Sequence, residues 1–232
     1  MKKIFFILVI ALYVSYLNCN AQNMISTDSV KMPNDQLVIN LLSNTWLNSP
    51  SNIKLMPVSI GSEVYFMTPV IGKYSVFSIA IGAGVGVNNI HNNALPYDSL
   101  EITNFKPISG GYEYVKNKIT TAYVDIPLEI RFRTQPNIKK RNFKVALGGK
   151  FGYLISNYIK YSGEDFRILS NKHVKFKEYN INNVIPYRYG VFIRVGYGKI
   201  NLIVNYTLSQ LFTNGKGPNV IPVSFGFSFT LL

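Results

Sequence analysis

Apolar and polar residues alternate along most of this chain with a period of two residues. In the stretch Tyr74–Asn88, Phe77 and Ile79 lie on one face, whereas Gly82 and Gly84 lie on the other. This period is typical of β-strands and differs from the 3.6-residue period of an amphipathic helix. The pattern predicts eight strands: Gln36–Leu47, Lys54–Met67, Tyr74–Asn88, Lys118–Arg133, Phe143–Lys160, Ile185–Tyr197, Ile200–Phe212 and Val220–Leu232.

The two faces of strands two to eight differ in composition. One face is apolar and carries no charged residue, whereas glycines and charged residues collect on the other. Glycine weakens a strand that faces water, but inside a narrow barrel it leaves room for long polar side chains. A basic residue on a lipid-facing position costs about 2–4 kcal/mol at mid-bilayer, which explains the uncharged face. We therefore expect an all-β fold, an eight-stranded antiparallel transmembrane (up-and-down) β-barrel, with a soluble sandwich as the alternative.

The connections between the predicted strands alternate in length. Thr68–Lys73, Thr134–Asn142 and Gly198–Lys199 are short, whereas His91–Asn117 and Ser162–Val184 are long. Outer-membrane barrels alternate short periplasmic turns with longer outer loops in this way. The lengths therefore place both ends of the barrel in the periplasm.

Three details of the strands carry further expectations. The first strand mixes apolar and polar residues on both faces, so its limits and pairing are the least defined. Pro127 lies in mid-strand and has no N–H to donate, so we expect a bulge there. Tyrosine and tryptophan near strand ends are candidates for the aromatic girdle at the membrane interface. These candidates are Trp46, Tyr65, Tyr158, Tyr161, Tyr187 and Tyr206.

The start of the chain has the features of an export signal. Lys2 and Lys3 precede the apolar stretch Ile4–Leu17, and Cys19-Asn20-Ala21 offers small residues for cleavage before Gln22. An uncleaved membrane anchor and a lipoprotein are the alternatives. We predict a signal peptide over 1–21, a flexible periplasmic leader over 22–35 and an outer-membrane barrel over 36–232.

Composition and charge limit the partners. Charged residues make up only 15% of the chain, against about a quarter in a usual soluble domain. The formal net charge is +13, but an exported protein rarely meets nucleic acid, so we expect none as a partner. Anionic lipid head groups and lipopolysaccharide fit this charge better. We expect the basic stretch Lys172–Lys177 to be a solvated loop, with a projecting hairpin that contacts lipopolysaccharide as the alternative.

The chain offers few residues for catalysis or metal binding. Its one cysteine, Cys19, leaves with the predicted signal, which excludes disulfides and thiolate metal sites in the mature protein. His91 and His173 lie in predicted outer loops without a spacing motif, and two histidines alone make a poor metal site. We expect no enzyme activity, no cofactor and no metal.

The polar face supplies the candidate site. An eight-stranded barrel is just wide enough for side chains to fill its interior. We expect the charged residues there to form an ion-pair network that plugs the barrel, with a narrow, anion-favouring pore as the alternative. The residues are Glu63, Asp125, Glu129, Arg131, Lys144, Lys150, Arg188 and Arg194.

Several segments resemble a known family. The hairpin from Val64 to Gly82, the stretch Asp125–Ile130 and the signal ending at Gln22 are similar to the PorT-like outer-membrane β-barrel family. The alternating stretch Val223–Leu232 resembles the terminal strand that the barrel-insertion machinery reads. The PorT-like resemblance implies a non-enzymatic outer-membrane protein of a Gram-negative bacterium, accessory to type IX secretion or to envelope structure. A narrow channel and a surface binding module that acts through its outer loops are the alternatives.

Overall fold

The computed structural model describes most of the chain from residue 36 onwards. Within Met32–Leu232, the described residues are 36–73, 75–108, 113–138, 141–165 and 170–231. The predicted signal peptide and leader lie outside the described residues, so this division of the chain stays a prediction.

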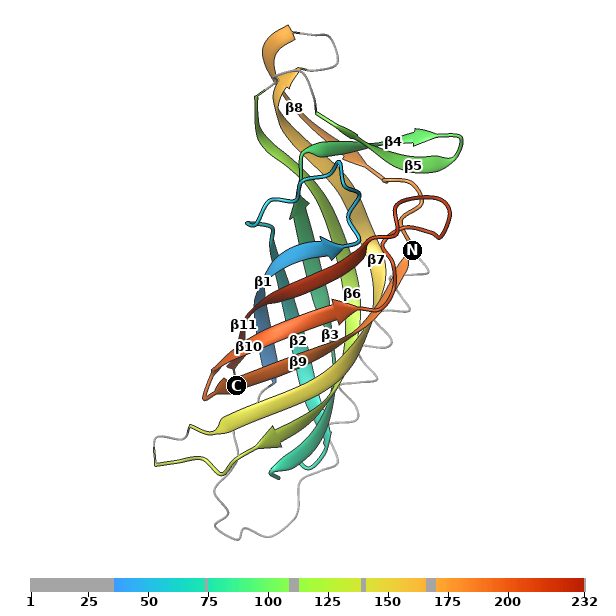
Figure 1. The fold of residues 1–232 in the computed structure, drawn as a ribbon. Helices are drawn as coiled ribbons and strands as arrows, with labels where there is room; N and C mark the ends of the chain where they lie inside the picture. Colours follow the sequence, from blue (N-terminus) through green and yellow to red (C-terminus); the bar gives the residue numbers. More distant parts are fainter. Residues whose placement is uncertain (1–35, 74, 109–112, 139–140, 166–169, 232) are drawn as a thin grey trace, which may run out of the picture. The chain divides into compact units, whose positions relative to one another are not determined.

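Eight antiparallel strands form a closed ring (Figure 1). Each pairs with its neighbour in the ring, β6 with β7, and β1 with both β2 and β11, so that the ring has no free edge. This confirms the predicted up-and-down barrel. The eight strands are β1 (Leu37–Leu47), β2 (Ile60–Ile71), β3 (Phe77–His91), β6 (Tyr114–Arg133), β7 (Phe143–Asp165), β9 (Tyr187–Tyr197), β10 (Ile200–Thr207) and β11 (Ile221–Leu231).

Three further strands lie in the two connections that we predicted as long loops. β4 (Ala94–Ser99) and β5 (Ile102–Pro107) form a separate hairpin between β3 and β6. β8 (Ser170–Tyr179) pairs with the C-terminal part of β7, from Tyr158 to Asp165. The stretch Lys172–Lys177 therefore lies in a β-hairpin with β7, so the expected loop was wrong, whereas contact with lipopolysaccharide stays a prediction. Figure 1 shows all three strands at one end of the barrel.

The side chains of the ring alternate between buried and exposed. On β10, Leu202 and Val204 are exposed, whereas Asn201 and Asn205 are buried. The same alternation runs along β9, and large apolar side chains face outwards all around the ring. A water-soluble monomer rarely exposes so continuous an apolar surface, which fits a barrel that has lipid around it. No helix among the described residues has the length and apolar character to cross a bilayer.

Several predicted strand limits were wrong. β2 begins at Ile60 rather than at Lys54, and β10 ends at Thr207 rather than at Phe212. Leu55 and Phe212 instead make isolated bridges to Asn92 and Val184 at the end of the barrel with the three extra strands. Apolar and polar residues go on alternating in these segments after the strands have left the ring. The alternation therefore did not mark the ends of the strands.

The expected bulge at Pro127 is also wrong. Pro127 lies opposite Lys150 in regular register, and the pairing of β3 with β6 keeps one register on both sides of it. The pairing of β6 with β7 has two register shifts, both nearer the end with the three extra strands. One lies between Tyr114 and Lys116, and at the other Ala122 and Tyr123 pair with Ser156 and Leu154. β7 has the extra residue there, so its outward side chains change from odd to even numbers.

Three of the six girdle candidates were wrong. Trp46, Tyr65 and Tyr161 are buried, with 5%, 4% and 0% of their surface exposed, whereas Tyr187 and Tyr206 are exposed on the outside. Tyr158 is half-buried. A tyrosine near a strand end can equally well point inwards, and its parity in the strand decides which.

The connections give the barrel an orientation. The connections from β2 to β3, from β6 to β7 and from β9 to β10 are short, and β1 begins and β11 ends at the same end. The β9–β10 connection is only two residues, and Gly198 takes a φ of 64° there, which a residue with a side chain rarely adopts. Because short turns are periplasmic in outer-membrane barrels, the end with β4, β5 and β8 is the outer end.

Candidate functional site

The interior of the barrel is lined by charged side chains from β2, β6, β7 and β9. All eight predicted site residues are on these strands and all are buried, with at most 7% of their surface exposed. The side chains point inwards because they alternate with the apolar residues that face outwards. The structure arranges them in two clusters.

The first group, which we call the central cluster, consists of Glu63, Asp125, Lys150 and Arg188. Arg188 donates two hydrogen bonds to Asp125, from Nη2 to Oδ2 at 2.6 Å and from Nε to Oδ1 at 3.0 Å. Lys150 pairs with Glu63, and Arg188 Nη2 lies 3.7 Å from Glu63 Oε1. Two carboxylates and two cations from four strands thus neutralise one another, which buried charges require.

Neutral side chains complete the hydrogen bonds of the central cluster. Tyr65 donates to Asp125 Oδ2 at 3.0 Å, and Asn40 donates to Glu63 Oε2 at 3.0 Å. The Arg188 guanidinium lies 4.1 Å from the centroid of the Tyr123 ring. These contacts give the charged groups of the central cluster further partners besides their ion pairs.

Glycines provide the room for this cluster. A Cβ added at Gly86 would lie 2.8 Å from Arg188 Nη2 and 2.9 Å from Asp125 Oδ2, and one at Gly152 would overlap Asp125 Oδ1. Gly149, which faces outwards, has only ordinary van der Waals contact, 3.6 Å to the Gly190 carbonyl oxygen. The inward glycines therefore make the close approach of the charged side chains possible.

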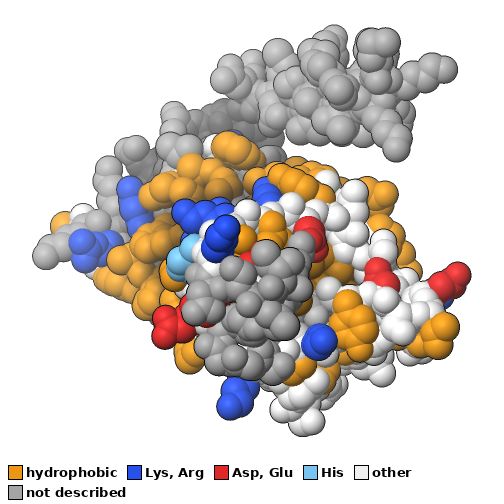
Figure 2. Space-filling view, turned by 90° about the horizontal axis from the view of Figure 1, so that it is seen from above, with side chains coloured by type: hydrophobic (Ala, Val, Ile, Leu, Met, Phe, Trp, Pro, Cys, Tyr) orange, Lys and Arg blue, Asp and Glu red, His pale blue; other side chains and the backbone are white. Residues whose placement is uncertain are grey.

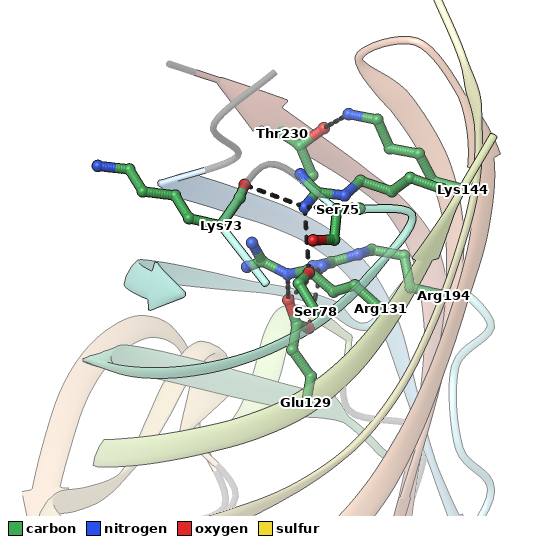
Figure 3. A network of polar contacts seen from close by, with 9 residues as sticks. Lys73, Ser75, Ser78, Glu129, Arg131, Lys144, Arg194 and Thr230 are labelled. Carbon is green, nitrogen blue, oxygen red and sulfur yellow. Dashed lines mark hydrogen bonds and ion pairs between the residues drawn. The ribbon is translucent and has the colours of Figure 1, made fainter. Parts of the chain in front are cut away.

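The second group, which we call the lower cluster, is centred on Glu129 (Figure 3). Arg194 Nη2 donates to both carboxylate oxygens, at 2.8 and 2.9 Å, and Arg131 pairs with the same carboxylate. Beyond it, Arg133 Nη2 donates to Ser78 Oγ at 3.1 Å, and Lys144 Nζ donates to Thr230 Oγ1 at 3.3 Å. Among the described residues, basic groups outnumber carboxylates at this end of the lumen, which is the end with the short connections.

Two residues of the interior were not among the predicted site residues. Arg133 was taken only as the end of a strand, and Tyr65 was assigned to the girdle because of its residue type. Both follow from period two, since Arg133 is two residues from Arg131 and Tyr65 is two residues from Glu63. The alternation along these two strands therefore indicates that both side chains point inwards.

An apolar group, which we call the cap cluster, fills the outer end. Phe105 from β5 packs edge-on against Trp46 and Phe212, with ring centroids 6.0 and 5.8 Å away. The buried members of the cap cluster are Trp46, Ile53, Ile90, Ala94, Phe105, Ile119, Ile159, Leu211, Phe212 and Val220.

Hydrogen bonds fix the β4–β5 hairpin in this place. The Thr103 N–H donates to the Lys216 carbonyl at 3.0 Å, and Asn117 Nδ2 donates to the Ala94 carbonyl at 2.8 Å. Asn182 Nδ2 donates to Asp98 Oδ2 at 2.6 Å. The hairpin is thereby tied to three other segments of the outer end.

The two histidines of the chain lie outside both charged clusters. His91 ends β3, and His173 lies in β8 opposite Glu164. Within the described residues, no three histidine, cysteine, aspartate or glutamate side chains lie close enough together to hold a metal ion.

Comparison with known proteins agrees with this architecture. The family model described as outer membrane protein beta-barrel domain matches residues 20–214. The match covers most of the chain, so the protein belongs to this family of outer-membrane β-barrels. No curated protein matches the chain. The family confirms the outer-membrane barrel, whereas the narrower PorT-like resemblance stays a prediction.

Proposed function

We propose that this outer-membrane barrel is a non-enzymatic, closed membrane anchor that holds a β-structure outside the bilayer as a surface binding module. The observation that carries the proposal is the contrast between a filled lumen and long outer strands. β6 has 20 residues and β7 has 23, whereas about 9–11 residues suffice for a strand to cross a bilayer. The surplus, together with β4, β5 and β8, supports a function at the cell surface.

The filled lumen argues against the channel alternative. A solute would have to pass the cap cluster, the central cluster and the lower cluster in turn. Each charged pair on this path would lose its partner in the process, and an unpaired buried charge is costly. The three layers therefore favour an anchor over a pore.

An accessory role in type IX secretion is the second candidate. It is supported by the resemblance of the hairpin from Val64 to Gly82 and of Asp125–Ile130 to PorT-like barrels. Measuring the secreted cargo of a deletion strain tests this role, and unchanged export would remove it.

Planar-bilayer recording tests whether the anchor is closed. We expect no stepwise conductance from the purified, folded protein, because ion pairs occupy the lumen. A variant that lacks the β4–β5 hairpin should also stay silent, since the central cluster lies below the cap cluster. Steady porin-like steps from the unaltered protein would disprove a closed anchor.

Single-cysteine labelling tests whether the extra strands lie outside the cell. Two variants are made, each with Cys19 also replaced by serine. One carries Lys175→Cys in β8 and the other carries Lys199→Cys in the β9–β10 turn, so that each has one thiol at one end of the barrel. On intact cells we expect a membrane-impermeant maleimide to label the first and not the second, and both after lysis. The reverse result would contradict the orientation and the surface role.

A further inference from the structure

A row of basic residues crosses four neighbouring strands at the outer end. Lys118 on β6 lies opposite His91 on β3 and opposite Lys160 on β7. Lys160 in turn lies opposite Lys177 on β8. We call Lys118, Lys160 and Lys177 the lysine row. Because residues that are directly opposite share one face of a sheet, these side chains are neighbours.

A second basic pair flanks the lysine row on its outer side. Lys116 and Lys175 both lie opposite Ser162, one step further from the membrane. Four of the five lysines are exposed, and Lys118 is half-buried. Seen from the outer end, basic side chains gather beside a histidine and next to apolar side chains (Figure 2).

The lysine row faces the same side as the lipid-facing surface. Along β6, the outward residues Leu128, Ile126 and Val124 are exposed and apolar, and the same parity continues to Lys118. Between the apolar residues and the row, Tyr158 on β7 lies opposite Tyr179 on β8. The surface thus changes from aliphatic to tyrosine to lysine, which is the order expected from hydrocarbon to head groups.

The lysine row makes no ion pair within the described part of the chain. Lys118 Nζ donates to Asn89 Oδ1 at 2.6 Å, and Lys177 Nζ lies 3.7 Å from the centroid of the Tyr158 ring. Among the carboxylates of these strands, Glu178 lies opposite Ile159 on the other face, and Glu164 lies further out. Like charges directly opposite one another destabilise a sheet, and a bound anion would remove this repulsion.

The neighbouring positive charges also affect the pKa of Lys118 and of His91. Partial burial, together with the charges of Lys116, Lys160 and Lys177, lowers the pKa of Lys118. Burial and the neighbouring Lys118 and Lys116 also lower the pKa of His91. A bound anion would reverse the effect of the neighbouring charges on both groups.

We propose that the lysine row, with Lys116 and Lys175, binds the phosphate groups of a phosphorylated lipid in the outer leaflet, of the lipid A type. Phosphate supplies the missing negative charge, and the acyl chains continue along the apolar surface below the row. Tyr158 and Tyr179 lie where the sugar or glycerol region of such a lipid would be. This inference requires that the barrel spans the outer membrane with the β8 end outwards, and it is independent of whether the lumen is closed.

The test compares binding of lipid A and of chemically dephosphorylated lipid A to the full-length protein in mixed micelles. The variant replaces Lys118, Lys160 and Lys177 together by glutamine. Since each basic residue near an anionic surface contributes about 1 kcal/mol, we expect the triple variant to lose roughly a hundredfold in affinity for lipid A. The control replaces Lys54, Lys106 and Lys216, three lysines of the same end, and should bind as the unaltered protein does.

Folding and ligand specificity are checked in the same samples. Without lipid, heat-dependent gel migration should show the triple variant to be at least as stable as the unaltered protein, because a repulsion has been removed. Lipid A should raise the melting temperature of the unaltered protein only. Equal affinity for dephosphorylated lipid A, equal loss in the control, or competition by inorganic phosphate at the concentration of the lipid would each overturn the proposal.

Discussion

Replacing Asp125 by leucine is expected to lower the free energy of unfolding by about 3–5 kcal/mol, the usual cost of removing one partner from a buried ion pair. Asp125 is fully buried and accepts two hydrogen bonds from Arg188 and one from Tyr65. Without it, Arg188 and Lys150 share a single carboxylate, Glu63. The measurement is urea-dependent unfolding of the barrel in lipid vesicles, followed by gel migration with and without boiling.

Two further variants separate the charge effect from loss of packing. Asp125→Leu combined with Arg188→Met removes both partners, and we expect it to recover part of the stability, because no unpaired charge is left. Glu101→Gln breaks an exposed pair with Lys216 at 3.7 Å and should leave the stability almost unchanged. A change below about 1 kcal/mol for Asp125→Leu would mean that the cluster is hydrated and that the lumen is open.

The sequence predicted the ring because lipid imposes a simple rule on it. Lipid-facing positions must be apolar, so period two holds along the ring strands from β2 to β11, except at the register shift in β7, and identifies the inward side chains. Tyr65 shows where residue type misled the interpretation, because a tyrosine was assumed to lie at the membrane interface. In the structure its hydroxyl contacts Asp125 inside the barrel.

The outer end was less predictable because water, rather than lipid, surrounds it. Its strands need not have a uniform face, so β4, β5 and β8 were read as loops. The cap cluster joins Trp46, Phe105 and Phe212, which are far apart in the sequence. Only the closed ring brings them together, and no local pattern marks such contacts.

The register shift between β6 and β7 also decides which residues belong to the lysine row. The extra residue in β7 near Leu154 changes which side chains face outwards, so Lys160 joins Lys118 only after the shift. A strict alternation from Phe151 would have placed Lys160 inside. The lysine row is therefore a product of the tertiary pairing and could not be read from one strand.

The second large effect is expected at the lipid-facing surface, where Val204→Arg should destabilise the barrel by about 2–4 kcal/mol. Val204 is 46% exposed and lies opposite Ile193 and Phe225, which are also exposed. In water, an arginine at so exposed a position would change stability by no more than about 0.5 kcal/mol. In lipid it places a charge at the middle of the hydrocarbon layer, so the size of the effect identifies the solvent.

Depth along the strand gives this prediction its control. Ile200→Arg on the same strand lies next to the periplasmic turn and should cost only about 0–1 kcal/mol, since its charge reaches the interface. Val115→Arg, at a position of β6 that is 80% exposed beyond the apolar band, should have almost no effect. Unfolding in vesicles measures all three variants on one scale. Equal, small effects at the three positions would mean that water surrounds the apolar face, and the membrane barrel would then be the wrong description of this fold.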